Sequence, residues 1–295
     1  MGGKVEGDRR SVTVMTGPTA SGKSRAALER ALADPSIEIV NADAQLLYRG
    51  FDIGTAKPTM EERAGVKHHL IDILDPNEKF SAAEYATQAR NAIRDIFERG
   101  RTPLVVGGTG FYIDALFRGL MISTVTDEKL AMARSRFASE LAKEGFEKMH
   151  LGLKTIDPDL YSQIAREMNP IRLERAWTHY YATGTTLGEA RKVKRDTFEY
   201  EPEFVVIDLP RPELWKRIAL RIDAMLNEGW VGEVRGLLSK GVDRNSPAMR
   251  AIGYLELLDV IEGKSRLDAA REAIIIRTRQ FAKRQVTWIR HQTLS

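Results

Sequence analysis

Short apolar runs alternate with amphipathic segments in both terminal parts of the chain. Four runs have the length and composition of buried strands: residues 12–16, 37–40, 104–106 and 204–209. Helical periodicity lies between them, notably over residues 25–33 and 82–99, and Asp75-Pro76 and Ser81 are turn and cap signals upstream of the second helix. Strands that alternate with helices predict an α/β fold with a parallel, doubly wound sheet and helices on both faces.

The middle of the chain has a different pattern. From about residue 121 to residue 200 strand signals disappear and helical periodicity replaces them, and residues 204–209 then restore a strand. We therefore expect an α/β core formed by residues 1–120 and 201–295. Residues 121–200 are expected to be an inserted helical domain and not a tandem domain.

The last segment of the chain predicts an amphipathic helix. Residues 264–295 contain eight Lys or Arg and two acidic residues. At about 100° per residue, one arc is apolar and holds Ile274, Ile275, Phe281, Ala282, Val286, Trp288 and Ile289. The opposite arc holds Arg277, Arg279, Lys283, Arg284 and Arg290, with Gln280, Thr287 and His291. This cationic face is either solvated or a contact surface for nucleic-acid phosphates, and the small number of acidic partners favours the second interpretation.

The composition narrows the class of protein. The chain has 295 residues, 29% charged and 43% hydrophobic, with a net charge of +4, which fits a globular protein of one large domain or two. It has no cysteine, which excludes disulfides and thiolate metal sites and fits a cytoplasmic location. The five histidines lack zinc-ligand spacing, and no apolar run is long enough to cross a bilayer.

A glycine-rich loop follows the first apolar run. It matches the G-x-x-x-x-G-K-[ST] pattern of a P-loop with Gly17, Pro18, Thr19, Ala20, Ser21, Gly22, Lys23 and Ser24. Between a strand and a helix, such a loop turns backbone N–H groups and the positive helix end toward phosphate oxygens. Lys23 adds a full charge, and Ser24 can ligate Mg²⁺. The motif predicts a diphosphate or triphosphate site in a P-loop NTPase-like core.

Two more polar segments follow strands at the end of the sheet where ligands bind in such folds. They are Asn41-Ala42-Asp43 and Gly107-Gly108-Thr109-Gly110. The second segment lacks the Asp that orients Mg²⁺ and water in ATPases and GTPases, and Asp208 could substitute for it only from a late position in the chain. Asp43 is either a turn or N-cap residue or, in the phosphate cleft, a carboxylate that accepts a proton from a nucleophile.

Six segments, in order along the chain, resemble the tRNA dimethylallyltransferase family, also called tRNA isopentenyltransferase or IPP transferase. They are 17–24; Asn41-Ala-Asp-Ala-Gln-Leu-Leu-Tyr48 leading into Asp52-Ile-Gly-Thr-Ala-Lys-Pro58; Gly107-Gly-Thr-Gly-Phe-Tyr112; Asn169-Pro-Ile-Arg-Leu-Glu-Arg175; Ala251-Ile-Gly-Tyr254; and Phe281-Ala-Lys-Arg-Gln-Val-Thr-Trp288. The P-loop alone is shared by many enzymes, whereas the strings at 52–58 and 282–285 are far more specific.

The resemblance implies a reaction and its components. A dimethylallyl group moves from dimethylallyl diphosphate to the N6 amine of the adenine 3′-adjacent to the anticodon in tRNA, and diphosphate is released. Mg²⁺ is the implied cofactor, tRNA the partner and a monomer the expected state. The helical insertion would contact the anticodon stem-loop.

The resemblance also implies roles for individual residues. The implied catalytic residues are Asp43 as general base, with Thr19, Lys23, Arg217 and Arg221 around the diphosphate. Both arginines lie on a helix-like run over residues 214–226, and either could reach the leaving group. The implied tRNA-contacting residues are Asp43, Ala44, Gln45, Leu46, Thr109, Ile171, Arg172, Leu173, Glu174 and Arg175, to which the basic helix adds Lys283 and Arg284.

The chain departs from the family's usual pattern at three of these segments. Ala44 stands where Ser is usual, Ile171 where Gln is usual and Leu255 where Lys is usual. These changes affect individual tRNA contacts and leave the catalytic residues in place.

Two other classes of function explain part of the pattern. A small-molecule kinase would bind ATP in the same loop and use Asp208 for Mg²⁺, but the missing acid after residues 104–106 argues against it. A noncatalytic RNA-binding P-loop protein would explain the basic tail but not Asp43 in the cleft.

Overall fold

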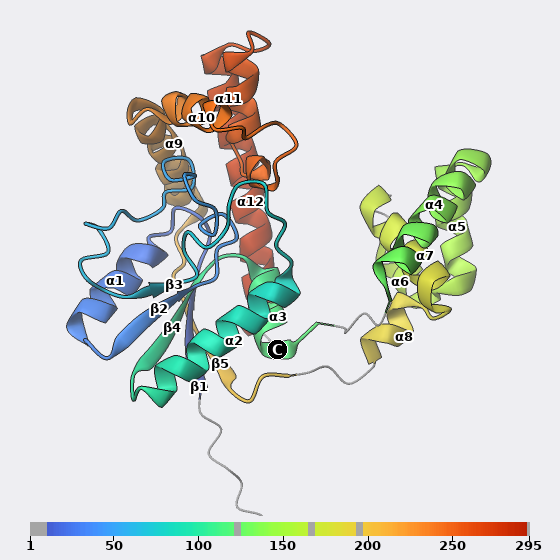
Figure 1. The fold of residues 1–295 in the computed structure, drawn as a ribbon, viewed down its shortest axis with the longest axis horizontal. Coiled ribbons are helices and arrows are strands. Elements are labelled where there is room, and N and C mark those ends of the chain that lie inside the picture. Colours follow the sequence, from blue (N-terminus) through green and yellow to red (C-terminus); the bar gives the residue numbers. More distant parts are fainter. Residues whose placement is uncertain (1–10, 121–124, 165–168, 193–196, 294–295) are drawn as a thin grey trace, which may run out of the picture. The chain divides into compact units, whose positions relative to one another are not determined.

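The computed structural model describes residues 11–120, 125–164, 169–192 and 197–293. Within these ranges the chain forms two compact units. Residues 11–119 and 197–293 form the first unit, which contains the sheet, and the described residues from 120 to 192 form the second, which is helical (Figure 1).

The first unit is built on a parallel five-stranded sheet with the order β3-β2-β4-β1-β5. The strands are β1 (Ser11–Thr16), β2 (Ile37–Asn41), β3 (His68–His69), β4 (Thr102–Gly107) and β5 (Glu201–Val206). In the register of the sheet, Thr16 lies beside Gly107 and Val206, and Asn41 lies beside Val106. The loops that follow β1, β2 and β4 therefore start at the same end of the sheet, as the sequence predicts for a parallel α/β fold.

Two features of the sheet differ from the sequence-based expectation. The last strand covers residues 201–206 and not 204–209, because the chain follows β1 only as far as the hydrogen bond from Ile207 N–H to the Thr16 carbonyl. Its polar first half is compatible with a strand, and Pro202 is tolerated, because β5 lies at the edge of the sheet. β3 has only two residues, too few to leave a periodic pattern in the sequence.

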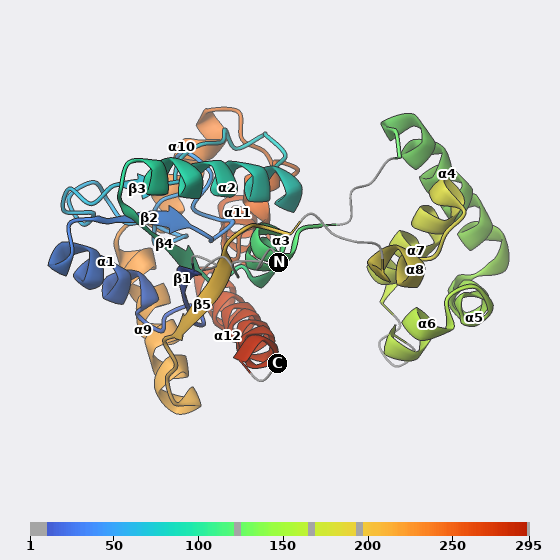
Figure 2. The ribbon, with the colours of Figure 1, turned by 90° about the horizontal axis from the view of Figure 1, so that it is seen from below.

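Helices cover both faces of the sheet (Figure 2). They are α1 (Lys23–Ala33), α2 (Ala82–Glu98), α3 (Gly110–Arg118), α9 (Arg211–Asn227), α10 (Trp230–Ser239), α11 (Tyr254–Ile261) and α12 (Leu267–Thr293), with the 3₁₀ helix η1 (Pro247–Arg250). On one face α1 packs Ala27 against Ile39 and Leu104. On the other face α2 contacts β2 and β4, and it begins with the expected cap, in which the Ser81 hydroxyl accepts the Glu84 N–H. No helix within the described ranges is both long and apolar enough to cross a membrane.

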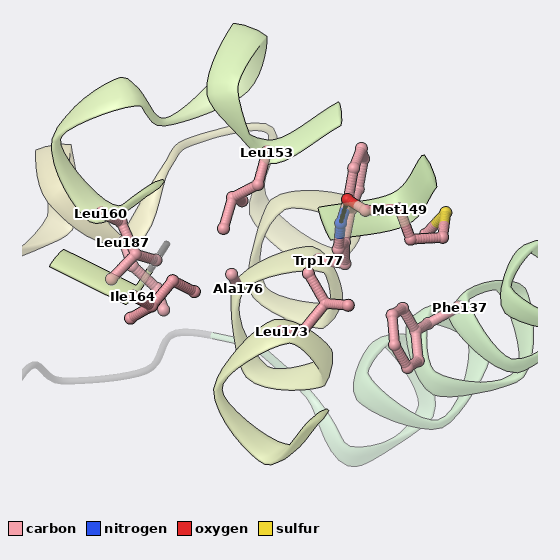
Figure 3. Packing of buried hydrophobic residues seen from close by; sticks show 9 residues of the cluster. All are labelled: Phe137, Met149, Leu153, Leu160, Ile164, Leu173, Ala176, Trp177 and Leu187. Atoms are coloured by element: carbon pink, nitrogen blue, oxygen red, sulfur yellow. Dashed lines mark hydrogen bonds between the residues drawn. The ribbon is translucent and has the colours of Figure 1, made fainter. Parts of the chain in front are cut away.

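The second unit has a hydrophobic core of its own. Its helices are α4 (Asp127–Glu144), α5 (Phe146–Ile156), α6 (Pro158–Ile164), α7 (Pro170–Thr183) and α8 (Leu187–Lys192). Trp177 on α7 lies at the centre of the packed side chains, near Phe137 and Met149, and its Nε1–H donates to the Met149 carbonyl at 3.0 Å (Figure 3). Leu173 and Ala176 continue the same face of α7, so this helix is the common packing partner of the unit.

Candidate active site

The phosphate loop connects β1 to α1 in a conformation that depends on small residues. A Cβ atom on Gly17 would lie 2.4 Å from the Ile207 carbonyl oxygen, so only glycine fits there. Gly22 has a φ of 98° and is the N-cap of α1. Ser21 is buried, and its Oγ has no hydrogen-bond partner within the described residues. A buried hydroxyl inside a ring of backbone donors is a group that a bound phosphate oxygen would satisfy.

Lys23 and Asp43 face each other across this loop. The Lys23 side chain is buried, and burial lowers its pKa while the nearby Asp43 carboxylate opposes that shift. Ser24, in contrast, is exposed at the first turn of α1. The loop thus holds one buried cation, Lys23, and one exposed hydroxyl, that of Ser24.

Asp43 is held by a network that starts at the end of β2. The Asn41 side chain accepts the Asp43 N–H at 2.9 Å and donates to the carbonyls of Asp43 and Leu70. One carboxylate oxygen of Asp43, Oδ1, accepts the Gln45 N–H at 3.0 Å. The interpretation of Asp43 as a turn residue is therefore correct for its Oδ1 oxygen. The side chain is nevertheless only half-buried and interacts electrostatically with Lys23 and Arg221, so its role as a proton acceptor stays a prediction beside the turn role.

The loop after β4 packs directly on the loop after β2. Thr109 donates its N–H to the Ala42 carbonyl, and its Oγ1 accepts the Ala44 N–H at 3.1 Å. A Cβ on Gly107 would lie 2.2 Å from the Ala42 backbone, which explains a glycine at this position. Thr109 therefore fixes the segment that contains Asp43, Ala44, Gln45 and Leu46, all four of which are half-buried.

Gln285 is a site residue that the sequence analysis missed. It lies on α12 and is 4% exposed. Its Oε1 accepts the Thr19 N–H at 2.8 Å, and its Nε2 donates to the Gly108 carbonyl at 2.9 Å. One side chain thus joins the phosphate loop to the loop after β4. The sequence feature that could have revealed this role is the position of Gln285, a polar residue on the apolar arc of the predicted helix, between Ala282 and Ile289.

Both predicted arginines lie at the phosphate loop. Arg221 Nη1 is 3.5 Å from Thr19 Oγ1, and its pKa is lowered by burial, with Asp43 opposing the shift. Arg217 Nη1 lies 3.8 Å from where a Cβ on Gly22 would be, while its Nε pairs with Glu213 at 2.9 Å. The two side chains lie near different residues of the loop, Arg221 near Thr19 and Arg217 near Gly22, so both are close to the phosphate loop.

The cationic face of α12 is smaller than the sequence predicts. Arg277 pairs with Glu256 of α11, and the guanidinium of Arg279 lies 5.8 Å from the Trp215 ring with its Nε buried. The expectation of few acidic partners was wrong for Arg277, because its partner Glu256 comes from another helix. Arg279 packs near the Trp215 ring instead of facing solvent as a free cation. Lys283, Arg284 and Arg290 remain exposed.

The helical unit presents most of its predicted contact residues at the start of α7. Asn169 caps this helix by accepting the N–H groups of Ile171 and Arg172. Ile171 is 74% exposed, and Arg172, Glu174 and Arg175 are also exposed. Leu173 is fully buried in the core of the unit, so its side chain has a structural role.

Two of the six family-like strings, at 52–58 and 251–254, make structural contacts. Lys57 is buried, and its Nζ pairs with Asp72 at 2.5 Å and with Asp52 at 2.7 Å. Glu233 of α10 accepts the Ile53 N–H at 2.7 Å and the Tyr254 hydroxyl at 2.7 Å. These bonds tie residues 52–58 and 251–254 to α10, and so support the loop after β2 without lining the phosphate site.

The described residues are compatible with a Mg²⁺ ion that takes most of its ligands from substrate and water. No group of three or more His, Cys, Asp or Glu side chains in these ranges could hold a metal. Mg²⁺ in phosphate sites typically uses one or two protein oxygens and keeps several waters. The exposed Ser24 hydroxyl at the start of α1 has the chemistry of such a ligand, and its role stays a prediction.

Comparisons with known proteins show the family of the chain. The family model described as IPP transferase matches residues 46–292. A tRNA dimethylallyltransferase of Methylococcus capsulatus is 43% identical over 285 residues, which cover 96% of this chain and 90% of the relative. A solved tRNA delta(2)-isopentenylpyrophosphate transferase of Staphylococcus epidermidis is 37% identical, with a TM-score of 0.66 over 95% of this chain and 89% of that one. A eukaryotic dimethylallyltransferase solved acting on tRNA is 28% identical, with a TM-score of 0.77 over 95% of this chain and 70% of that one.

Proposed function

The chain belongs to the IPP transferase family, and on this premise we propose how its residues transfer a dimethylallyl group to tRNA. It is a tRNA-modifying prenyltransferase that alkylates the N6 amine of the adenine 3′-adjacent to the anticodon and releases diphosphate. The observation that carries the assignment of residues is the phosphate loop with Lys23 and two arginines, placed directly beside Asp43 and Thr109.

The donor in this proposal is dimethylallyl diphosphate bound in the phosphate loop. The backbone N–H groups of residues 20 and 22–24, the Ser21 hydroxyl and Lys23 contact the phosphates, while the Ser21 N–H donates to the Pro18 carbonyl within the loop. Arg217 lies near Gly22 and Arg221 near Thr19, where they stabilise negative charge as the allylic C–O bond breaks. Ser24 would hold Mg²⁺, which would neutralise further charge on the leaving diphosphate.

The acceptor in this proposal is the adenine amine beside Asp43. As the N6–C bond forms, the diphosphate takes the electron pair of the breaking C–O bond, and the N6 proton passes to the free carboxylate oxygen of Asp43. The exocyclic amine is a weak nucleophile, so a fixed carboxylate is needed to orient it. Asn41 and the Gln45 N–H provide that fixation, and Thr109 holds the neighbouring backbone.

The target adenine must leave its stack to reach a site at the end of a sheet. We propose that Ile171, Arg172, Glu174 and Arg175 at the exposed start of α7 contact the anticodon stem-loop, together with Lys283 and Arg284 of α12. The chain is proposed to act in the cytoplasm, where its tRNA substrate is found, and as a monomer.

The decisive experiment supplies matched donors and acceptors. The protein is incubated with Mg²⁺, labelled dimethylallyl diphosphate and an anticodon stem-loop that has adenine 3′ to the anticodon, and the nucleosides are analysed. Label is expected on adenine N6 only, with none on a stem-loop that has guanine at that position, and none with a Lys23→Met variant. ATP hydrolysis stimulated by the stem-loop, without prenyl transfer, would instead support a nucleotide-driven enzyme.

A further inference from the structure

One face of α12 is seated on the loop after β4 and on α3, which follows that loop (Figure 1). Gln285, Trp288 and Gln292 share this face, because they lie three and four residues apart on the helix. A Cβ atom on Gly108 would lie 2.2 Å from Gln285 Nε2. A Cβ atom on Gly110 would lie 2.4 Å from the Trp288 ring. Both side chains of α12 therefore fill space that a side chain in the loop would take.

Asp114 of α3 holds the same face beyond the loop. Its Oδ2 accepts the Trp288 Nε1–H at 2.8 Å, and its Oδ1 accepts from Gln292 Nε2 at 3.4 Å. Arg118, one turn further along α3, pairs with Asp114 at 3.5 Å and donates to Gln292 Oε1 at 2.5 Å. The Phe204 ring of β5 packs against Trp288, with 6.1 Å between the ring centroids. Because the N–H and the ring of Trp288 are both held, α12 has little freedom to slide along α3.

The bonds of Gln285 depend on this position of the helix. Gln285 lies three residues before Trp288, and its amide joins the Thr19 N–H at 2.8 Å to the Gly108 carbonyl at 2.9 Å. Both distances are typical of well-formed hydrogen bonds. An α-helix rises about 1.5 Å per residue, so a shift of α12 by a single residue would break both bonds. The contact that fixes Trp288 therefore also decides whether Gln285 reaches the phosphate loop.

We propose that Asp114 is a positioning residue for the donor. Through the Trp288 N–H it fixes α12 along α3, and so keeps the Gln285 amide between the phosphate loop and the loop after β4. The inference rests on the proposed function, because it takes the phosphate loop as the site of the donor. Asp114 acts only through α12 in this proposal, so its effect on the phosphate loop should disappear when the Gln285 amide is absent.

The test measures hydrogen exchange of the Thr19 amide in the protein without substrates. The partner of this N–H is the Gln285 side chain, so its exchange reports directly whether Gln285 is in place. The variants are Asp114→Ala, Gln285→Ala and the double variant. Asp114→Asn removes the charge but keeps an oxygen that can accept the Trp288 N–H.

Two controls separate positioning from general stability. Asp95→Ala is the matched variant, because Asp95 also pairs with an arginine four residues further along its helix, Arg99 of α2, at 2.9 Å. The Ile39 amide of β2, which donates to the Lys67 carbonyl, reports general opening of the sheet. Donor KM and kcat for prenyl transfer, and the dissociation constant of the stem-loop, are measured on the same proteins.

The proposal predicts that Asp114→Ala and Gln285→Ala act as one. Asp114→Ala should raise exchange at Thr19 by about fivefold, the scale of one lost hydrogen bond, and leave Ile39 unchanged. In the Gln285→Ala background it should add less than about twofold. Donor KM should rise by a similar factor, with the stem-loop dissociation constant unchanged. Asp114→Asn should retain most of the protection at Thr19, and Asp95→Ala should match wild type.

Four results would overturn the proposal. Exchange at Thr19 in Asp114→Ala equals that of wild type, the effects of Asp114→Ala and Gln285→Ala multiply in the double variant, the Thr19 and Ile39 amides both exchange faster, or donor KM stays unchanged although exchange at Thr19 rises. The third result would show a structural role alone. A protein that shows the exchange pattern but transfers no prenyl group would contradict the proposed function and not the positioning of Gln285 by Asp114.

Discussion

At the scale of single residues, the site depends on polar side chains that join loops from different strands. Asp43 is oriented by Asn41, the segment after it is held by Thr109, and Thr19 is held by Gln285. Each bond is made to a backbone N–H group, so each side chain fixes the path of a loop. Reactive groups that are held in this way need little rearrangement in the transition state.

Replacing Asp43 by Ala should lower turnover by about 10²–10⁴, the usual contribution of a positioned base. The fold and donor binding should persist, because the backbone of this turn is also held by Asn41 and Thr109. Single-turnover transfer at saturating stem-loop RNA is the measurement, with donor affinity as the control. A loss of less than about threefold would exclude Asp43 as the general base.

Replacing Gln285 by Ala should loosen the phosphate loop relative to the loop after β4. The Thr19 N–H and the Gly108 carbonyl would lose their partner, and an unsatisfied buried group costs about 1–3 kcal/mol. We expect KM for the donor to rise by about tenfold while the dissociation constant of the stem-loop stays unchanged. Gln280→Ala, an exposed glutamine on the same helix, is the control. Equal effects of the two variants on donor KM would show that Gln285 does not position the loop.

At the scale of elements, α12 serves two purposes. Its buried side closes the first unit through Ile274, Ala282 and Ile289 and also delivers Gln285 to the site. Its exposed side retains Lys283, Arg284 and Arg290 after Arg277 pairs with Glu256. The residues available to RNA are therefore those in the second half of the helix, beyond Gln280.

Replacing Lys283 and Arg290 together by Gln should weaken stem-loop binding and flatten the plot of log K against log salt by up to about two, near one for each lost phosphate contact. Point charges on phosphates position RNA without reading its bases, so the preference for the target adenine should not change. Arg277→Gln should leave the salt slope unchanged, because Glu256 neutralises this arginine. An unaltered slope in the double variant would mean that the face is only solvated.

At the scale of the whole molecule, the first unit is held together by a charged cluster on the α2 face of the sheet. Glu38 of β2 is 2% exposed and bonds to Arg99 at the end of α2 and to His69 of β3, with Arg101 at 2.8 Å. Hydrogen bonds from Arg99 hold the pKa of Glu38 at about 2, well below its usual value, although burial opposes that shift. One carboxylate thus connects three elements of the sheet layer.

Acid should therefore destabilise the first unit in a defined range of pH. Because the folded pKa of Glu38 is depressed from 4.5 to about 2, its contribution is complete above pH 4.5 and is lost as pH falls toward 2. By linkage the loss is at most about 3 kcal/mol. Denaturant unfolding at a series of pH values from 7 to about 3 is the measurement. Glu38→Gln should be less stable than wild type at pH 7 and should show a shallower decline below pH 4.5. Parallel declines would assign the acid sensitivity to other carboxylates.

The sequence by itself determined the parts of the molecule that depend on local pattern. Apolar periodicity located β1, β2 and β4 and the helices α1, α2, α9 and α12, and the segments after those strands held the phosphate loop, Asp43 and Thr109. These residues converge because parallel strands expose their carboxyl ends on one side of a sheet. Local pattern also placed β5 three residues too late, because an edge strand does not need an apolar face.

Only the tertiary structure decided the contacts between segments far apart in the chain. Gln285 lies 266 residues after Thr19 in the sequence, and hydrophobic periodicity cannot predict that the Gln285 amide bonds to the Thr19 N–H. Arg277 lies on the cationic face predicted for α12, but it pairs with Glu256 of α11. The sequence left open whether Arg217 or Arg221 approaches the phosphate loop, and in the structure both lie close to it. Hydrophobic pattern fixes which face of an element is buried, whereas the packing of whole elements fixes which polar groups then meet.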